Sequence, residues 1–283
     1  MKKYSCIVIA AAVMLMFFSA CGVNVDGVSD ESETAHTAVV DSMTFDHGHG
    51  SVCHVRACVD AEYPSHYKND SLTRRIQTLY VREVLNLPGD SMSVDSALAV
   101  TVRAMLAQFG DAEDEIEYGI SATGRVQSFS AEKNITISRD GAVPGIMTFC
   151  CHDTVNKGDV AAMDSHRYVN VDLNSMTVMD VYDLFDEAAV PEVAELLKAA
   201  LLEQTNAKSE DDLIGMGYFN LDNITANGNF YFGENGVTWN YLPYEIACFS
   251  VGETQITLDY NALAPYISSR SVLYNYVKNY NSR

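Results

Sequence analysis

The stretch "NFYFGENGVTWNYLPYEIA", from Asn229 to Ala247, carries the clearest structural signal in the chain. Asn235 and Gly236 separate two runs rich in aromatic residues, and an Asn-Gly pair in this setting is the strongest short-range signal for a β-hairpin. Alternate residues of a strand share a face, so Trp239 and Tyr241 are expected side by side after the turn. The stretch therefore predicts two antiparallel strands.

Pro243 interrupts the second run, because proline cannot donate to a strand ladder and marks a strand edge or a bulge. We expect the bend to re-aim the residues that follow it. The candidate binding surface is an aromatic patch near this sheet edge, made of Trp239, Tyr241, Tyr244 and Glu245. A second hypothesis gives Glu245 a catalytic role, since apolar surroundings raise the pKa of a carboxyl group in sugar-hydrolysing sites. A place on the polar face of a strand is the favoured interpretation of Glu245.

The order of the other elements predicts the fold class. Val55, Ala57, Val59 and Ala61 alternate with polar residues in a half-buried strand that is expected to stop at Pro64. Two helices follow, the first from about Asp70 or Ser71 and the second from about Ser93 to Gly110; then come strands at 134–138, 145–151 and 166–173, a helix at 187–204, and strands up to Tyr260. Strands with short turns and separate groups of helices favour an α+β fold: a mostly antiparallel sheet with helices packed on one face.

The first residues of the chain have the pattern of a targeting signal. Lys2 and Lys3 precede an uncharged run, 6–20, which is shorter than the roughly 20 residues that span a bilayer. The run ends in "FSAC", which resembles the lipobox of bacterial lipoproteins; an ordinary cleaved signal is the alternative. The resemblance implies a lipoprotein signal peptide at residues 1–20 and a diacylglyceryl group on Cys21.

The remaining chain is expected to form a tether and one folded unit. Residues 21–47 are small and acidic and predict a flexible tether. Residues 48–283 form the folded unit, with an N-terminal part at 48–150 and a C-terminal part at 151–283.

Charge limits the partners. The formal net charge is −20, and loss of residues 1–20 leaves 16 basic against 38 acidic residues, a charge of −22. Nucleic acid is therefore excluded as a partner, because it demands clustered Lys and Arg. Anionic lipid repels such a chain, so membrane attachment is expected to come from the acyl chains on Cys21.

Cysteine and histidine spacing gives no redox or metal motif. Cys53, Cys58, Cys150, Cys151 and Cys248 leave at least one thiol unpaired, and their pairing stays open. His47 and His49 share a strand face with Asp46, Cys53 or His54 nearby, but the fixed ligand spacing of metal sites is missing. We expect no metal and no cofactor.

A hydrolase is the alternative function. His152-Asp153 and Asp164-Ser165-His166 flank one loop, and a Ser-His-Asp triad there is conceivable, although triads are defined by geometry and no GxSxG motif occurs. The alternative is a cell-wall-directed hydrolase that uses Glu245 or the His152/His166 loop.

The C-terminal half resembles a known family. "MTVMDVYDLF", an amphipathic helix and then "GYFNLDNITANGNFYFGENGVTWNYLPYEIACFSVGETQITLDYNAL" are similar to the RsiV-like domain, domain-of-unknown-function family 3298. Asp183-Leu184-Phe185, Pro243 to Ala247, Gly252 and Leu263 fit its pattern. The similarity covers about 166–267, and 48–150 resembles a weaker N-terminal partner region with Tyr63-Pro64 before a helix.

The resemblance implies an extracytoplasmic α+β module without accepted catalytic residues. In the anti-sigma factor RsiV such a region senses lysozyme by binding it, and in some cell-wall deacetylases it accompanies a separate catalytic domain. Relatives often carry a Gly-Gly-Ala-His run in the central loop, whereas this chain has only Gly158 and His166 there. We therefore expect a non-catalytic envelope lipoprotein that binds a cationic protein such as lysozyme, or an envelope glycan. Gly22 after the lipidated cysteine favours the outer membrane in a cell with two membranes.

Overall fold

The computed structural model describes residues 32–48, 51–89, 92–111, 127–138, 143–156 and 162–280. The expected signal segment, Cys21, His49 and Gly158 lie outside these residues. Within the described part of the chain, no helix is both long enough and apolar enough to cross a bilayer.

Two sheets and several helices make up the fold. β1 to β6 form a six-stranded sheet in chain order, in which β1 and β2 are antiparallel, β2 and β3 parallel, and β5 and β6 antiparallel. A second, antiparallel sheet has the order β7-β8-β9. The expected α+β class is confirmed. The chain divides into two compact units, residues 1–136 with 151–164 and residues 137–150 with 165–283. The expected boundary at residue 150 lies inside the strand Ile146–Asn156. Residues 137–150 belong to the second unit and residues 151–164 to the first.

β1 (Ser32–Gly48) corrects the expected tether. Residues 32–47 were assigned to a flexible segment because they lack a long apolar pattern, yet they pair antiparallel with β2 (Ser51–Tyr67), with Val39 opposite Val59. The strand is held by backbone pairing with a distant partner, which side-chain periodicity does not report. Residues 21–31 of the expected tether lie outside the described residues.

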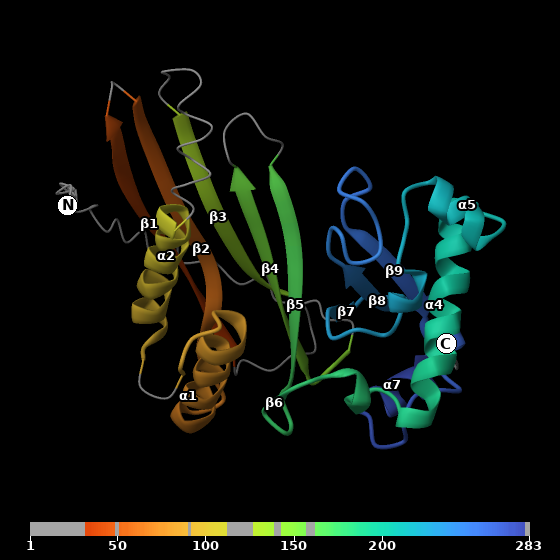
Figure 1. Ribbon diagram of the computed structural model, residues 1–283. Helices are drawn as coiled ribbons and strands as arrows, with labels where there is room; N and C mark the ends of the chain where they lie inside the picture. The colour runs from red at the N-terminus through yellow and green to blue at the C-terminus, as the bar shows by residue number, and fades with distance from the viewer. Residues whose placement is uncertain are drawn as a thin grey trace. The chain divides into compact units, whose positions relative to one another are not determined.

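The first unit packs helices on β2. Val55, Ala57, Val59 and Ala61 are buried on one face, as predicted. Pro64 does not end the strand, because it lies beside a register shift, where β2 continues past it to Tyr67. α1 (Asp70–Leu79), the π-helix η1 (Tyr80–Val84) and α2 (Val94–Asp111) follow, and Asn69 caps α1 through its side chain. Both α-helices contact β2 (Figure 1). β3 (Gln127–Ser138) lies next to β2 in the sheet.

The second unit contains the three-stranded sheet and the helices that pack around it. It begins in β4 (Ile146–Asn156) and β5 (Met163–Asp172), whose other ends belong to the first unit, and continues with β6 (Thr177–Val178) and the 3-10 turns η2 (Val181–Asp183) and η3 (Glu187–Ala189). α4 (Val190–Thr205) has proline in its first turn, where this residue is tolerated, and contacts β9. α5 (Glu210–Gly215) and the 3-10 turn η4 (Leu221–Asn223) lead into β7 (Phe230–Phe232), β8 (Gly236–Tyr241) and β9 (Thr254–Asp259). α6 (Tyr260–Leu263) and α7 (Leu273–Tyr280) end the described chain.

The predicted hairpin is present. β7 and β8 pair antiparallel with Phe230 opposite Trp239, and Gly236 is the first residue of β8. Gly236 lies so close to β9 that a Cβ atom there would stand 2.1 Å from the carbonyl oxygen of Leu258. The close approach of the two backbones therefore requires glycine at this position.

Candidate functional site

Trp239 and Tyr241 do not belong to a binding surface, and this part of the prediction is wrong. Both side chains are 0% exposed in the core of the second unit. The Trp239 ring stacks with Phe185 at a centroid distance of 6.2 Å. The Tyr241 hydroxyl donates to the carbonyl oxygen of Thr225 at 2.7 Å, and burial followed by the nearby Glu245 carboxylate raises the pKa of Tyr241 well above its ordinary value. The face that Trp239 and Tyr241 share points into the core.

Tyr244 is exposed and has an unusual backbone. Its φ angle is +70°, and the Glu245 N–H donates to the carbonyl oxygen of Leu242 at 3.0 Å. A proline in the second position and a positive φ in the third are typical of a type II turn, which ordinarily places glycine or asparagine in the third position. A bulky residue there costs of order 1 kcal/mol or more. The turn nevertheless presents a tyrosine ring that is 61% exposed.

Glu245 holds this turn. One carboxylate oxygen accepts the Leu242 N–H at 2.9 Å, and the other accepts the side-chain amide of Asn227 at 3.2 Å. The side chain is partly buried. Both of its oxygens thus have hydrogen-bond donors, and its role in this structure is to close the turn that carries Tyr244.

Exposed apolar side chains gather around this turn. The Tyr244 ring stacks with Phe249 at a centroid distance of 6.0 Å. Tyr218 forms an antiparallel bridge with Ala247, which brings the segment that follows α5 beside the loop. We name five apolar side chains of these two segments the loop patch. Four of them are exposed and Phe249 is half-buried: Ile214, Met216, Leu242, Tyr244 and Phe249. Exposed apolar groups that cluster in this way mark interaction sites more often than scattered ones do.

The charge along this segment has one sign. Between Lys208 and Arg270 the sequence has eight Asp and Glu residues and no Lys or Arg. Three of the acids, Glu210, Asp211 and Asp212, form the first turn of α5, the same short helix that carries Ile214. The surroundings of the loop patch therefore favour a cationic partner.

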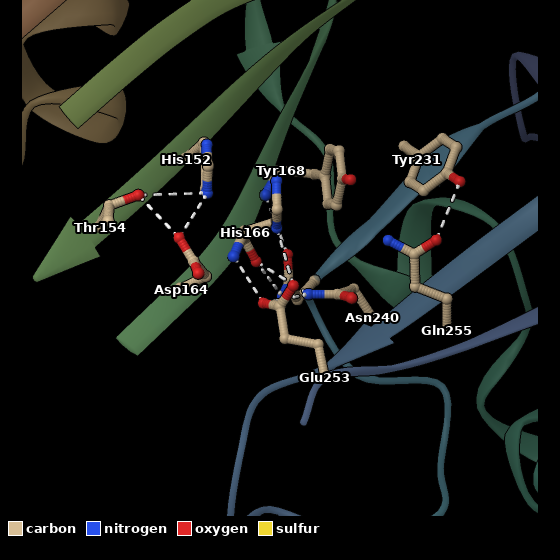
Figure 2. A network of polar contacts seen from close by, with 10 residues as sticks. His152, Thr154, Asp164, His166, Tyr168, Tyr231, Asn240, Glu253 and Gln255 are labelled. Carbon is tan, nitrogen blue, oxygen red and sulfur yellow. Dashed lines mark hydrogen bonds and ion pairs between the residues drawn. The ribbon is translucent and has the colours of Figure 1, made fainter. Parts of the chain in front are cut away.

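A network of side-chain hydrogen bonds connects the end of the same loop to β5. Glu253 accepts the backbone N–H of His166 at 2.5 Å and faces His166 Nδ1 at 2.7 Å. The side-chain amide of Asn240 donates to Glu253 at 3.1 Å and to the carbonyl oxygen of His166 at 2.9 Å. Figure 2 shows these three side chains pointing toward one another. His166 is therefore held by contacts with Glu253 and Asn240, and neither of these two residues was singled out from the sequence.

His152 belongs to a separate cluster in the first unit. Its Nε2 lies 3.1 Å from an oxygen of Asp164 and 3.4 Å from the hydroxyl of Thr154, and that hydroxyl itself donates to the same Asp164 oxygen at 2.7 Å. Figure 2 draws this cluster as well. A Ser-His-Asp relay uses the two imidazole nitrogens separately, one toward the nucleophile and one toward the acid. In this cluster a single nitrogen faces both groups, so the contacts do not form that relay.

The described residues offer no metal-binding group of three or more His, Cys, Asp or Glu side chains. His47 lies in β1, but the expected pairing with His49 falls outside the described residues. Cys248 carries a free thiol in the loop, and the hydroxyl of Ser250 at 3.1 Å lowers the pKa of that thiol.

Comparisons with known proteins match part of this chain to one family. The model of a family described as "Protein of unknown function (DUF3298)" matches residues 182–261. A solved DUF3298 family member from Bacteroides fragilis has a TM-score of 0.71 at 14% identity, over 89% of this chain and 98% of that chain. A DUF3298 family protein from Pseudomonas aeruginosa has a TM-score of 0.50 at 13% identity, over 86% of this chain and 98% of that chain. No curated protein matches.

The match confirms, at the level of the DUF3298 family, the resemblance seen in the sequence, and the solved structures show the fold alone. The matched segment contains Glu245, Glu253 and the whole of the loop that carries Tyr244, whereas His166 precedes it. Asn240 and Glu253 were missed because neither residue type stands out in a chain rich in Asn and acids; only the contact with a residue far along the sequence identifies them.

Proposed function

We propose that this protein is a non-catalytic binding protein of the bacterial cell envelope, and that its partner docks on the loop patch. The observation that carries the proposal is Tyr244: an exposed aromatic ring on a backbone conformation that bulky residues seldom adopt. Strain of this kind persists where the surrounding structure over-determines it, and it concentrates at binding and catalytic sites. The hydrogen bond from the Leu242 N–H to the Glu245 carboxylate and the fixed φ of Pro243 supply that constraint.

The partner that fits this surface is a cationic protein. Aromatic rings bind the side chains of Arg and Lys through cation–π contacts and stacking. The first turn of α5 carries Glu210, Asp211 and Asp212, and the segment between Lys208 and Arg270 has no Lys or Arg, which favours a partner of positive charge. Lysozyme is the first candidate, because the sequence resembles the RsiV-like domain and lysozyme is strongly basic. An envelope glycan is the other expected ligand, and it becomes an outcome of the test.

The location follows from the lipobox-like "FSAC" segment. We propose that Cys21 carries the acyl chains that hold the protein to a membrane, with the outer membrane favoured where a cell has two. Metabolic labelling with a fatty-acid analogue tests this, since Cys21→Ser removes the acceptor thiol and must abolish the label.

Calorimetric titration with lysozyme at low and at high salt tests the binding proposal. We expect binding that weakens with salt, and a loss of about tenfold in affinity for Tyr244→Ala, as for an aromatic anchor of moderate weight. Tyr182→Ala is the matched control, because Tyr182 is 60% exposed against 61% for Tyr244 and lies outside the loop patch. No binding at low salt, or equal losses for both variants, contradicts the proposal.

Two further arms separate the alternatives. Binding of purified peptidoglycan that Tyr244→Ala abolishes, without binding of lysozyme, assigns the site to a glycan. Release of soluble fragments from peptidoglycan that Glu245→Gln abolishes restores the hydrolase alternative. The second result is not expected, because both oxygens of Glu245 already accept hydrogen bonds within the turn.

A further inference from the structure

The loop that carries Leu242, Tyr244 and Phe249 of the patch has a hydrogen-bonded glutamate at each end. This loop, residues 242–252, connects β8 to β9. Glu245 closes its first turn, and Glu253 lies directly after its last residue, just before β9. Glu253 is only 15% exposed, so it does not take part in the surface that presents Tyr244.

Three asparagines join the two glutamates. The side-chain amide of Asn227 donates to Glu245 and to the carbonyl oxygen of Asn240, each at 3.2 Å, and its own oxygen accepts the Asn229 N–H at 2.9 Å. The side chain of Asn229 accepts the Tyr168 N–H at 2.8 Å and donates to the His166 carbonyl oxygen at 3.0 Å. The side chain of Asn240, which is 0% exposed, completes the path to Glu253. The contacts are therefore continuous from the Tyr244 turn to His166.

Through this path Glu253 and His166 can stabilise the turn that carries Tyr244. The links from Glu245 to Glu253 and His166 are hydrogen bonds between partly buried groups, and such links are more sensitive to the loss of one member than exposed pairs are. A loop whose ends are held in this way loses less conformational entropy on binding than a mobile one.

We infer that Glu253, together with His166, is a positioning residue for the partner site: it acts through Asn240, Asn229 and Asn227 on the turn that presents Tyr244, without touching the partner. This inference rests on the proposed function of the loop patch. It gives His166 a structural purpose in place of the catalytic one considered from the sequence. It also gives Glu253, which lies 87 residues from His166, a function that no local motif indicates.

The first measurement needs no partner. Amide hydrogen exchange is followed at Tyr244 and Glu245, whose N–H groups donate to Ala247 and Leu242 within the loop. In Glu253→Ala we expect exchange at these two amides to become about tenfold faster or more, with the amides paired between β8 and β9 unchanged. Glu253→Gln should restore slow exchange, because its side-chain oxygen still accepts from the His166 N–H and from Asn240. Glu234→Ala, at an exposed glutamate between β7 and β8, is the control.

The second measurement places the effect at Tyr244. We expect Glu253→Ala to weaken lysozyme binding by about tenfold, and to have no further effect once Tyr244→Gly has removed the ring, because a positioning residue acts only through what it positions. If Glu253→Ala prevents folding, Asn227→Asp replaces it, since that change sets a second carboxylate against Glu245.

The two measurements distinguish failure of the positioning role of Glu253 from failure of the proposed binding of a partner at the loop patch. Unchanged exchange at Tyr244 and Glu245 overturns the inference, whatever the wild-type protein binds. Equal losses from Glu253→Ala with and without the Tyr244 ring also overturn it, because Glu253 then acts elsewhere. Faster exchange without any lysozyme binding supports the inference for the loop and rejects lysozyme as the partner.

Discussion

β8 and the 242–252 loop are neighbours in the chain and both contain aromatic residues, yet β8 buries these side chains in the core and the loop exposes one of them to solvent. In β8 the side chains of Trp239 and Tyr241 are completely buried, whereas Tyr244, three residues after Tyr241, is 61% exposed. β8 is the central strand of its sheet, paired with β7 on one side and β9 on the other, and each of its residues is buried. After Tyr241 the chain leaves the ladder, and the side chains that follow lose the neighbouring strands that cover β8.

The comparison shows that aromatic content alone does not indicate a binding surface. The same residue type fills the core where strands cover both edges of its own strand, and it becomes available to a partner where a turn carries it out of the sheet.

The largest difference is expected for stability. Trp239→Ala should lower the free energy of unfolding by about 3–5 kcal/mol, because it leaves a cavity between Phe185 and Phe230. Tyr244→Ala should change it by no more than about 0.5 kcal/mol. Chemical denaturation followed by circular dichroism measures both, since Trp239 is the only tryptophan and its fluorescence is lost with it. If both changes destabilise the protein equally, Tyr244 is a core residue and the comparison fails.

A smaller effect is expected where β8 begins. Gly236→Ala should destabilise the protein by about 2 kcal/mol or more, because the added Cβ would meet the Leu258 carbonyl oxygen at 2.1 Å and separate β8 from β9. Gly228→Ala is the matched control, since an added Cβ there meets nothing within 4 Å. Thermal unfolding of the two variants distinguishes them, and equal midpoints would show that the approach of β8 to β9 is not tight.

The smallest effect concerns the hydroxyl of Tyr241. Tyr241→Phe should cost about 1 kcal/mol at neutral pH, because the carbonyl oxygen of Thr225 loses its donor. Burial raises the pKa of Tyr241 in the folded state, so its contribution is complete below the unfolded pKa of about 10 and is lost as the pH rises above that value. The stability difference between wild type and Tyr241→Phe should therefore shrink in alkaline solution. A difference that stays constant across this range argues against a buried, neutral hydroxyl.

Local patterns predicted much of the fold. The alternation of Val55 to Ala61, the hairpin around Asn235-Gly236 and the helix expected at 187–204 are all present, because each depends on residues that are close in sequence. β1 was missed because its small and polar side chains carry no such pattern and it is ordered by pairing with β2. The candidate surface was predicted in part: the bend at Pro243 and the exposure of Tyr244 follow from the backbone limits of proline, but the burial of Trp239 and Tyr241 depends on what packs against them.

The amino-acid sequence was sufficient for the α+β class, the family resemblance and the acidic surroundings of the site, since composition, periodicity and turn chemistry are properties of short segments and of residue counts. It was not sufficient for the positive φ of Tyr244, the role of Glu245 inside its turn, or the contact between His166 and Glu253 across 87 residues. These features depend on hydrogen bonds between groups that are brought together only when the second unit folds around its three-stranded sheet. Tyr241 and Tyr244 are the same residue type, and only the packing of distant segments makes one buried and the other exposed.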